Sequence, residues 1–167
     1  MPIVTTIEGR IAQVAIDRPE KRNTLSSELC KDLAREFLEL NDDTRVRSIV
    51  LCGHNNVFCA GLDIEEQLAE NTPIFNEFQK VIDALDALSK PVVAAVSGPA
   101  VSQGAAMLYH CDLVFAGEHA LFSMPGLALG QTPRYGVSLL AVKSGGYKLA
   151  AQKLLLSEPI SAAEAGA

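Results

Sequence analysis

The hydrophobic pattern changes period several times along the chain. Residues 3–7 and 11–16 are rich in β-branched residues and flank Glu-Gly-Arg, which predicts a β-hairpin. Four later runs are short and almost fully apolar, as is typical of strands buried in a parallel sheet. They occupy residues 48–53, 91–98, 112–117 and 120–124.

Between these runs, apolar residues recur at helical spacing. In 27–41 they share one face from Leu29 to Leu40, and Thr24 or Ser26 is placed to cap the first turn. Further helices are predicted at 63–70, 73–88, 102–111 and 137–156. Strands that alternate with helices indicate an α/β fold with a largely parallel sheet. No repeat or linker interrupts the pattern, so we expect a single domain over 1–167.

Composition narrows the function classes. The 167 residues are 49% hydrophobic and 20% charged, which is typical of a globular protein. The net charge is −6 and no Lys or Arg cluster occurs, which argues against a nucleic-acid partner or an anionic membrane. We find no signal-peptide pattern and no apolar run of spanning length, so we expect a cytoplasmic protein.

The cysteines and histidines show no metal-ligand spacing. Four cysteines stand at irregular intervals in apolar surroundings, which predicts buried free thiols in a reducing compartment. The three histidines are likewise scattered, so no metal site is predicted. The cysteines are Cys30, Cys52, Cys59 and Cys111.

Two turns are built from unusually small residues. "FCAGLD" (58–63) and "SGPAVSQGAA" (97–106) each lead from an apolar strand to a helix. Each turn alone is explained by packing. In the first turn, Asp63 is then the N-cap of the helix that follows. Together they offer a second interpretation, in which two bare backbone N–H groups are directed at one ligand oxygen, as in an oxyanion hole.

Several motifs resemble the crotonase superfamily of enoyl-CoA hydratases and isomerases. They are "RPEKRN", "FCAGLDIEE", "KPVVAAVSGPAVSQGAAMLYHCDLVFAGEHALFSMPGLALGQTP" and "LSEPISAAEAGA", in family order from the first strand to the last residue. The resemblance implies a crotonase-like spiral of ββα units that binds an acyl-CoA thioester. It also implies a C-terminal helical region that builds a homotrimer or a dimer of trimers. That region is expected to be missing, because the chain ends just after a capping box at Ser161 and Glu164.

The resemblance assigns the oxyanion donors to backbone groups. The N–H of Leu62 in "AGLD" and the N–H of Gln103 in "VSQGA" match the family's pair, and they would stabilise a thioester enolate. Gln103 is a departure, because many relatives have glycine there.

The resemblance also implies a CoA site and no tightly bound cofactor, since coenzyme A arrives as part of the substrate. Lys21 and Arg22 would lie beside the phosphates and pantetheine. Ala60, Asp63 and Ile64 would lie against the adenine, largely through backbone contacts.

The proton carrier is not found where the family places it. Hydratases of this family use two glutamates, and the matching positions hold Ala106 and Gly126. The peroxisomal-type Δ3,Δ2-enoyl-CoA isomerases, which share "GPAV" and "LGQ.P" and resemble this chain more closely, place one glutamate after the second Pro. That position holds Arg134, which cannot act as a base near neutral pH.

Nearby residues leave several alternatives open. Tyr135 could donate a proton, although its ordinary pKa near 10 makes it a poor base. His110 has suitable chemistry, but a structural role is favoured by its place at a helix end. Arg134 could instead pair with a carboxylate on an unusual acyl group or on a neighbouring element. The other polar residues nearby are Ser102, Tyr109 and Asp63.

Three functions are therefore compatible with the sequence. The first is an acyl-CoA enzyme that acts through an enolate, by isomerisation, atypical hydration, hydrolysis or C–C cleavage. The second is a non-catalytic acyl-CoA-binding or interaction module that has lost its glutamates. The third is an α/β domain whose small-residue turns only serve packing. Without the C-terminal region, we expect apolar faces to be exposed on 73–88 and on the end of 137–156.

Overall fold

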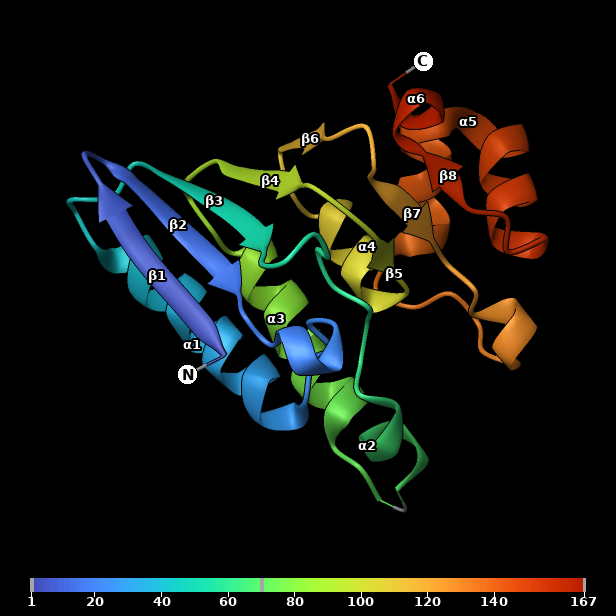
Figure 1. Cartoon of the computed structure of the whole chain (residues 1–167), viewed down its shortest axis with the longest axis horizontal. Helices are drawn as coiled ribbons and strands as arrows, with labels where there is room; N and C mark the ends of the chain where they lie inside the picture. Colours follow the sequence, from blue (N-terminus) through green and yellow to red (C-terminus); the bar gives the residue numbers. More distant parts are fainter. Residues whose placement is uncertain (1, 70, 167) are drawn as a thin grey trace.

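A five-stranded sheet forms one half of the molecule (Figure 1). The computed structural model describes residues 2–69 and 71–166. The strand order is β1-β2-β3-β4-β6, with β1 antiparallel to β2 and every later pair parallel, which confirms the predicted hairpin and parallel sheet. The strands are β1 (Ile3–Glu8), β2 (Ile11–Ile16), β3 (Ser48–Gly53), β4 (Val92–Val96) and β6 (Leu113–Ala116).

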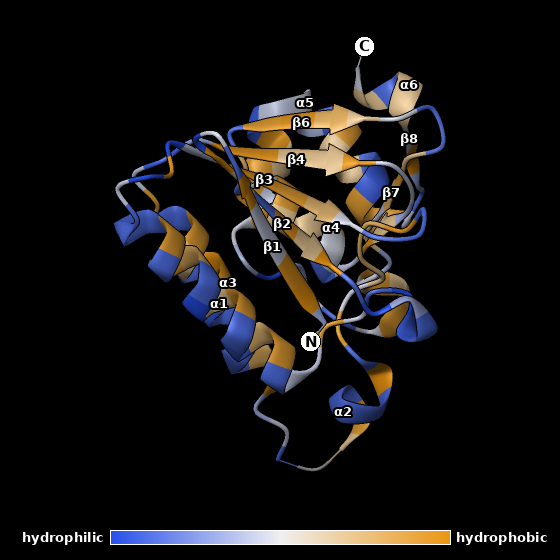
Figure 2. Cartoon of the chain, turned by 60° about the vertical axis from the view of Figure 1, so that its left-hand side comes forward, coloured by the Kyte–Doolittle hydropathy of each residue, from blue (hydrophilic) through white to orange (hydrophobic). Residues whose placement is uncertain are grey.

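Two long helices cover one face of this sheet (Figure 2). Helix α1 (Ser27–Asp42) begins at Ser26, whose hydroxyl accepts a hydrogen bond from the Leu29 N–H. Its apolar side packs against the apolar side of α3 (Ile74–Asp86), and both are buried. The prediction that 73–88 would expose an apolar face is therefore wrong, because α1 and the sheet cover it.

The opposite face of the sheet is less covered than the apolar runs predicted. In β3, Ile49 and Leu51 are fully buried beneath the helices, whereas Val50 and Cys52 are only half-buried. Strand β6, predicted to be buried, is an edge strand whose four residues are all exposed, with Phe115 66% accessible. The apolar runs indicated the strands correctly but not their burial, because burial depends on what packs over each face.

A second, smaller ladder runs beside the large sheet. It contains β5 (Ala100–Val101), β7 (Leu121–Ser123) and β8 (Ile160–Ser161), with β5 parallel to β7. Two isolated parallel bridges, Leu25 to Leu62 and Cys59 to Ala100, extend the same pairing to earlier parts of the chain. The chain therefore passes from a long strand to a short extended segment and then to a helix, several times in succession.

The remaining elements are short except for α5. They are η1 (Pro19–Lys21), α2 (Ile64–Leu68), α4 (Gln103–Leu108), η2 (Leu127–Leu129), α5 (Val137–Leu155) and α6 (Ala162–Ala165). The helices predicted at 63–70 and 102–111 are thus shorter than expected, and residue 70 lies outside the described residues.

Helix α5 matches its prediction and departs from helical geometry at Gly146, which has φ 78°. Its end exposes Leu155 and Leu156, each 65% accessible, as expected. The capping box between Ser161 and Glu164 is formed at the start of α6.

The four cysteines are free, as predicted; Cys30 and Cys59 are buried, and the other two are half-buried. Burial raises the pKa of the Cys59 thiol to about 12, so it stays neutral. Among residues 2–69 and 71–166, no helix is both long and apolar enough to cross a bilayer.

Two leucines of α1 test the packing. Leu33 is fully buried and Leu38 is 48% exposed. We expect Leu33→Ala to lower the free energy of unfolding by about 2–5 kcal/mol, because it leaves a cavity under the sheet. The same change at Leu38 should stay within about 0.5 kcal/mol. Urea unfolding of both variants measures the difference, and equal losses would contradict this packing.

Candidate functional site

The two small-residue turns lie side by side and are joined by backbone hydrogen bonds. The Phe58 N–H donates to the Pro99 carbonyl at 3.0 Å, and the Val101 N–H donates to the Cys59 carbonyl at 2.9 Å. These bonds accompany the parallel bridge between Cys59 and Ala100. The pairing places the two turns next to each other, as the predicted arrangement of two N–H groups around one ligand oxygen requires.

Glycines allow this close approach. A Cβ on Gly104 would clash with the Cys59 carbonyl oxygen, so the second turn can lie against the first only with glycine there. Gly61 has φ 96°, which favours glycine, and a Cβ there would lie 3.1 Å from the Val101 carbonyl oxygen. Packing between the turns therefore accounts for these small residues, whether or not a ligand also approaches.

The ladder determines where the Leu62 N–H points. On one side, the Leu25 N–H donates to the Gly61 carbonyl and the Asp63 N–H donates to the Leu25 carbonyl, both at 2.8 Å. Successive residues of an extended segment direct their N–H groups to opposite sides. The Leu62 N–H therefore points away from Leu25, toward the second turn, where it donates to Oε1 of Gln103 across 3.4 Å. At this length the hydrogen bond is weak.

The second N–H belongs to the first residue of α4. The Ser102 N–H donates to the Ser123 carbonyl at 2.7 Å, and Ser102 takes an unusual backbone conformation with φ 54°. Within the described part of the chain, the next N–H, that of Gln103, has no acceptor. The site thus holds one weakly engaged N–H and one without a protein partner, with the Gln103 side chain between the turns and only 7% exposed.

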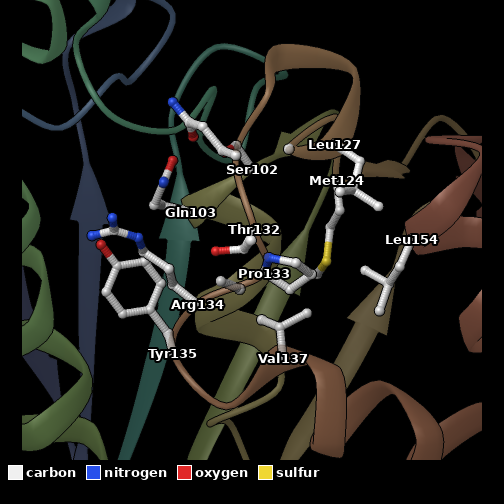
Figure 3. A pocket seen from close by; sticks show the side chains of 13 residues that line it. Ser102, Gln103, Met124, Leu127, Thr132, Pro133, Arg134, Tyr135, Val137 and Leu154 are labelled. Carbon is white, nitrogen blue, oxygen red and sulfur yellow. The ribbon is translucent and has the colours of Figure 1, made fainter.

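A cavity of about 50 Å³ lies beside the second turn, where Ser102 and Gln103 line it (Figure 3). Its wall comes from the start of α4, the segment after β7, the loop 131–136 and α5. Ala106 and Gly126 both line it, so the two positions that the resemblance matched to glutamates do share one cavity. Neither side chain can move a proton, and none of the described lining residues is Asp or Glu.

Arg134 is the charged residue of this wall. Its guanidinium carbon lies 4.8 Å from the centroid of the Phe75 ring, a cation–π contact, and the side chain is exposed. Among residues 2–69 and 71–166, no carboxylate lies within ion-pair distance of it.

Tyr135 lines the same cavity, with its ring held by α3. The ring packs edge-to-face on Phe78, with centroids 4.7 Å apart, and the hydroxyl donates to the Phe75 carbonyl at 3.4 Å. Burial raises the pKa of Tyr135 to about 12, against the opposing effect of the nearby Arg134 charge. The hydroxyl therefore stays protonated near neutral pH.

His110 has a structural position, as the sequence favoured. Its Nδ1 lies 2.7 Å from Oδ1 of Asp86, and its Nε2 lies 3.0 Å from the Tyr135 carbonyl oxygen. It thus ties α3 to the loop that carries Arg134 and Tyr135. Asp112 is also structural, because its carboxylate accepts a hydrogen bond from the Val92 N–H at 2.7 Å.

The residues matched to a CoA site gather on the other side of the first turn. The Ala60 N–H donates to the Arg22 carbonyl at 3.2 Å, which joins the "PEKRN" loop to that turn. Lys21 pairs with Glu65 at 3.0 Å, and this partner raises the pKa of Lys21. Arg22 and Ile64 are exposed beside them. The structure therefore brings these predicted residues together.

Asp63 is the exception, because its side chain is buried. It caps α2 by accepting from the Glu65 N–H and pairs with Arg18 at 3.2 Å. It can therefore offer a ligand little beyond its backbone.

The sequence analysis did not identify Asn23, whose side chain holds the "RPEKRN" loop (18–23) in place. Asn23 is fully buried; Nδ2 donates to the carbonyls of His54 and Val57, and Oδ1 accepts from the Arg18 N–H. No periodicity signals a buried Asn in a charged loop, so its role became visible only in the structure.

The contact between Leu62 and Gln103 can be tested directly. We expect Gln103→Ala to speed hydrogen exchange of the Leu62 amide about two- to fivefold, because a hydrogen bond of this length contributes about 0.5–1 kcal/mol. NMR exchange measures this rate, and the Asp63 amide, held by Leu25, is the internal control. Gln131→Ala alters another glutamine of the same cavity and should leave Leu62 unchanged. An equal rate in wild type and Gln103→Ala would refute the contact.

Comparison with known proteins adds independent information. Residues 6–167 match the family model described as enoyl-CoA hydratase/isomerase. A short-chain-enoyl-CoA hydratase of Clostridium acetobutylicum is 33% identical over 98% of this chain. A 2,3-dehydroadipyl-CoA hydratase of Escherichia coli is 32% identical over the same share. The chain spans 64% and 65% of these two relatives.

A solved structure agrees with the fold. The enoyl-CoA hydratase/isomerase of Pseudoalteromonas atlantica superposes with a TM-score of 0.92 at 32% identity, over 99% of this chain and 66% of that one. The expected α/β spiral is thereby confirmed.

Proposed function

Since the chain belongs to the enoyl-CoA hydratase/isomerase (crotonase) family, we propose that it binds an acyl-CoA thioester and polarises its carbonyl group. The carbonyl oxygen would accept hydrogen bonds from the N–H groups of Leu62 and Gln103. The observation that carries this proposal is the Gln103 N–H, which has no acceptor among the described residues and adjoins a weakly held Leu62 N–H.

Such a pair acts on charge that develops during the reaction. When a thioester becomes an enolate, negative charge moves to its oxygen, and fixed N–H donors stabilise that charge without reorganising. The Gln103 amide oxygen stands at the Leu62 N–H in the free protein, so the thioester must displace it. The long 3.4 Å separation makes that displacement cheap.

The CoA portion would lie along the first turn. Arg22 supplies positive charge there, next to the exposed Ile64 and the Ala60 backbone, and the ammonium group of Lys21 lies beside it, paired with Glu65. Positive charge at this place suits the phosphates of CoA, whereas the chain as a whole carries −6. No other cofactor is needed for this chemistry.

The sequence motifs and the compared relatives point to different reactions. The motifs "GPAV" and "LGQTP" favour Δ3,Δ2-enoyl-CoA isomerisation, while the relatives compared above are hydratases by name. Either reaction needs a proton carrier. Tyr135 is one candidate donor in the cavity, but its hydroxyl donates to the Phe75 carbonyl and its raised pKa makes it a weak acid.

A second candidate function is acyl-CoA binding without turnover. It is favoured by the absence of any carboxylate among the described lining residues, since Ala106 and Gly126 replace the matched glutamates.

We further propose assembly into a homotrimer or a dimer of trimers, which is supported by the exposed apolar residues of β6 and the end of α5.

Calorimetry with three ligands tests the carbonyl site. We expect butyryl-CoA to bind about fivefold to thirtyfold more tightly than the thioether S-butyl-CoA, which has no carbonyl, because one or two hydrogen bonds are gained. Free CoA should bind no better than the thioether. Gln103→Ala, which removes the competing amide oxygen, should increase the preference for the thioester.

Two outcomes would contradict the proposal. Equal binding of thioester and thioether would leave a CoA site without a carbonyl site, and no binding of any ligand would remove the CoA site as well. Incubation with crotonyl-CoA distinguishes an enzyme from a protein that only binds acyl-CoA. Loss of the enoyl absorbance or a shift of the double bond would identify an enzyme.

A further inference from the structure

The cavity that Gln103 lines has one charged side chain among its described lining residues. Arg134 supplies it, and the other described lining residues are neutral near pH 7. No Asp or Glu lines the wall, although acidic residues outnumber basic ones in the chain, 20 to 14. The one charge on the described wall is therefore positive, opposite in sign to the net charge of the chain.

Arg134 is held in place but not neutralised. The Phe75 ring supports the guanidinium at 4.8 Å, and the Tyr135 backbone behind it is tied to His110 at 3.0 Å. Outside this cavity, Lys153 shows the contrast, since Glu164 at 3.1 Å and the Pro159 carbonyl engage its ammonium group. Among the described residues no carboxylate pairs with Arg134, whose guanidinium lies beside the Phe75 ring and the neutral Tyr135 hydroxyl.

We propose that Arg134 binds a carboxylate on the acyl group, so that the preferred ligands are CoA thioesters of dicarboxylic acids. This inference rests on the proposed function, because the thioester carbonyl must first sit at Leu62 and Gln103. Figure 3 shows Gln103 and Arg134 on the wall of one cavity, from α4 and from the loop 131–136. A guanidinium suits this task because its planar fork matches both carboxylate oxygens.

A phosphate of CoA would be attracted by the same chemistry. It is the less favoured source, because the exposed Arg22 provides positive charge beside the first turn, where the CoA portion is placed, whereas Lys21 there is paired with Glu65. Arg134 lies in the cavity that the acyl group would enter. The two possibilities predict different results for free CoA. Its affinity should fall when Arg134 is replaced only if Arg134 binds a phosphate.

The test compares matched ligands by calorimetry. Malonyl-, glutaryl- and adipyl-CoA are each paired with the neutral acyl-CoA of equal carbon count: propionyl-, valeryl- and hexanoyl-CoA. We expect the best dicarboxylic ligand to bind about five- to thirtyfold more tightly than its neutral partner, the range between an exposed ion pair and a hydrogen bond to a charged group in a pocket. Added salt should reduce this ratio.

Variants assign the effect to Arg134. Arg134→Gln should bring the ratio close to one by weakening the dicarboxylic ligands more than their neutral partners, while Arg134→Lys should retain part of the ratio. Arg47→Gln removes an equal charge from an exposed position at the start of β3 and should not alter the ratio.

Three results would overturn the inference. The first is an unchanged ratio in Arg134→Gln. The second is an equal loss of affinity for free CoA and every acyl-CoA in that variant, which would identify a phosphate as the bound anion. The third is absence of binding of any acyl-CoA, neutral ligands included, and only this result would remove the proposed function too.

Discussion

The pairing of two backbone segments, around Cys59 and Ala100, is the contact on which the candidate site depends. Hydrogen bonds at 2.9 and 3.0 Å join these segments, and a glycine at 104 lets them lie close enough to form. Each segment is also tied outward, the first to Leu25 and the second to Ser123. Because both ends of this ladder are fixed, the N–H groups that remain are held in place by the fold rather than by their own side chains.

A site made of backbone groups tolerates unusual side chains. Leu62 and Gln103 differ in size and polarity, yet each contributes an N–H from a position that the ladder determines. The same tolerance lets the Gln103 side chain turn back onto the Leu62 N–H. A catalytic carboxylate would have no such protection, because one substitution removes it, and the two positions that the resemblance matched to glutamates hold Ala106 and Gly126.

The sequence predicted the features that depend on local pattern. The helices from 27 and 73, the cap at Ser26 and the two paired turns follow from periodicity, polar caps and glycine placement. Prediction from the sequence failed where burial or pairing depends on residues far away in the chain. The exposure of β6, the pairing of Asp63 with Arg18 and the burial of Asn23 each depend on segments far apart in the sequence. The contact between Gln103 and Leu62 belongs to the same class, since it spans 41 positions.

The charge state of the cavity is fixed near neutral pH. Arginine remains protonated in proteins, and burial keeps the hydroxyl of Tyr135 neutral by raising its pKa to about 12. The other described lining residues do not titrate. If the chain binds a thioester as proposed, fixed N–H dipoles and one permanent positive charge would govern that binding. Any pH dependence of turnover near neutrality must then arise from the ligand or from groups outside this wall, because no side chain in it changes charge there.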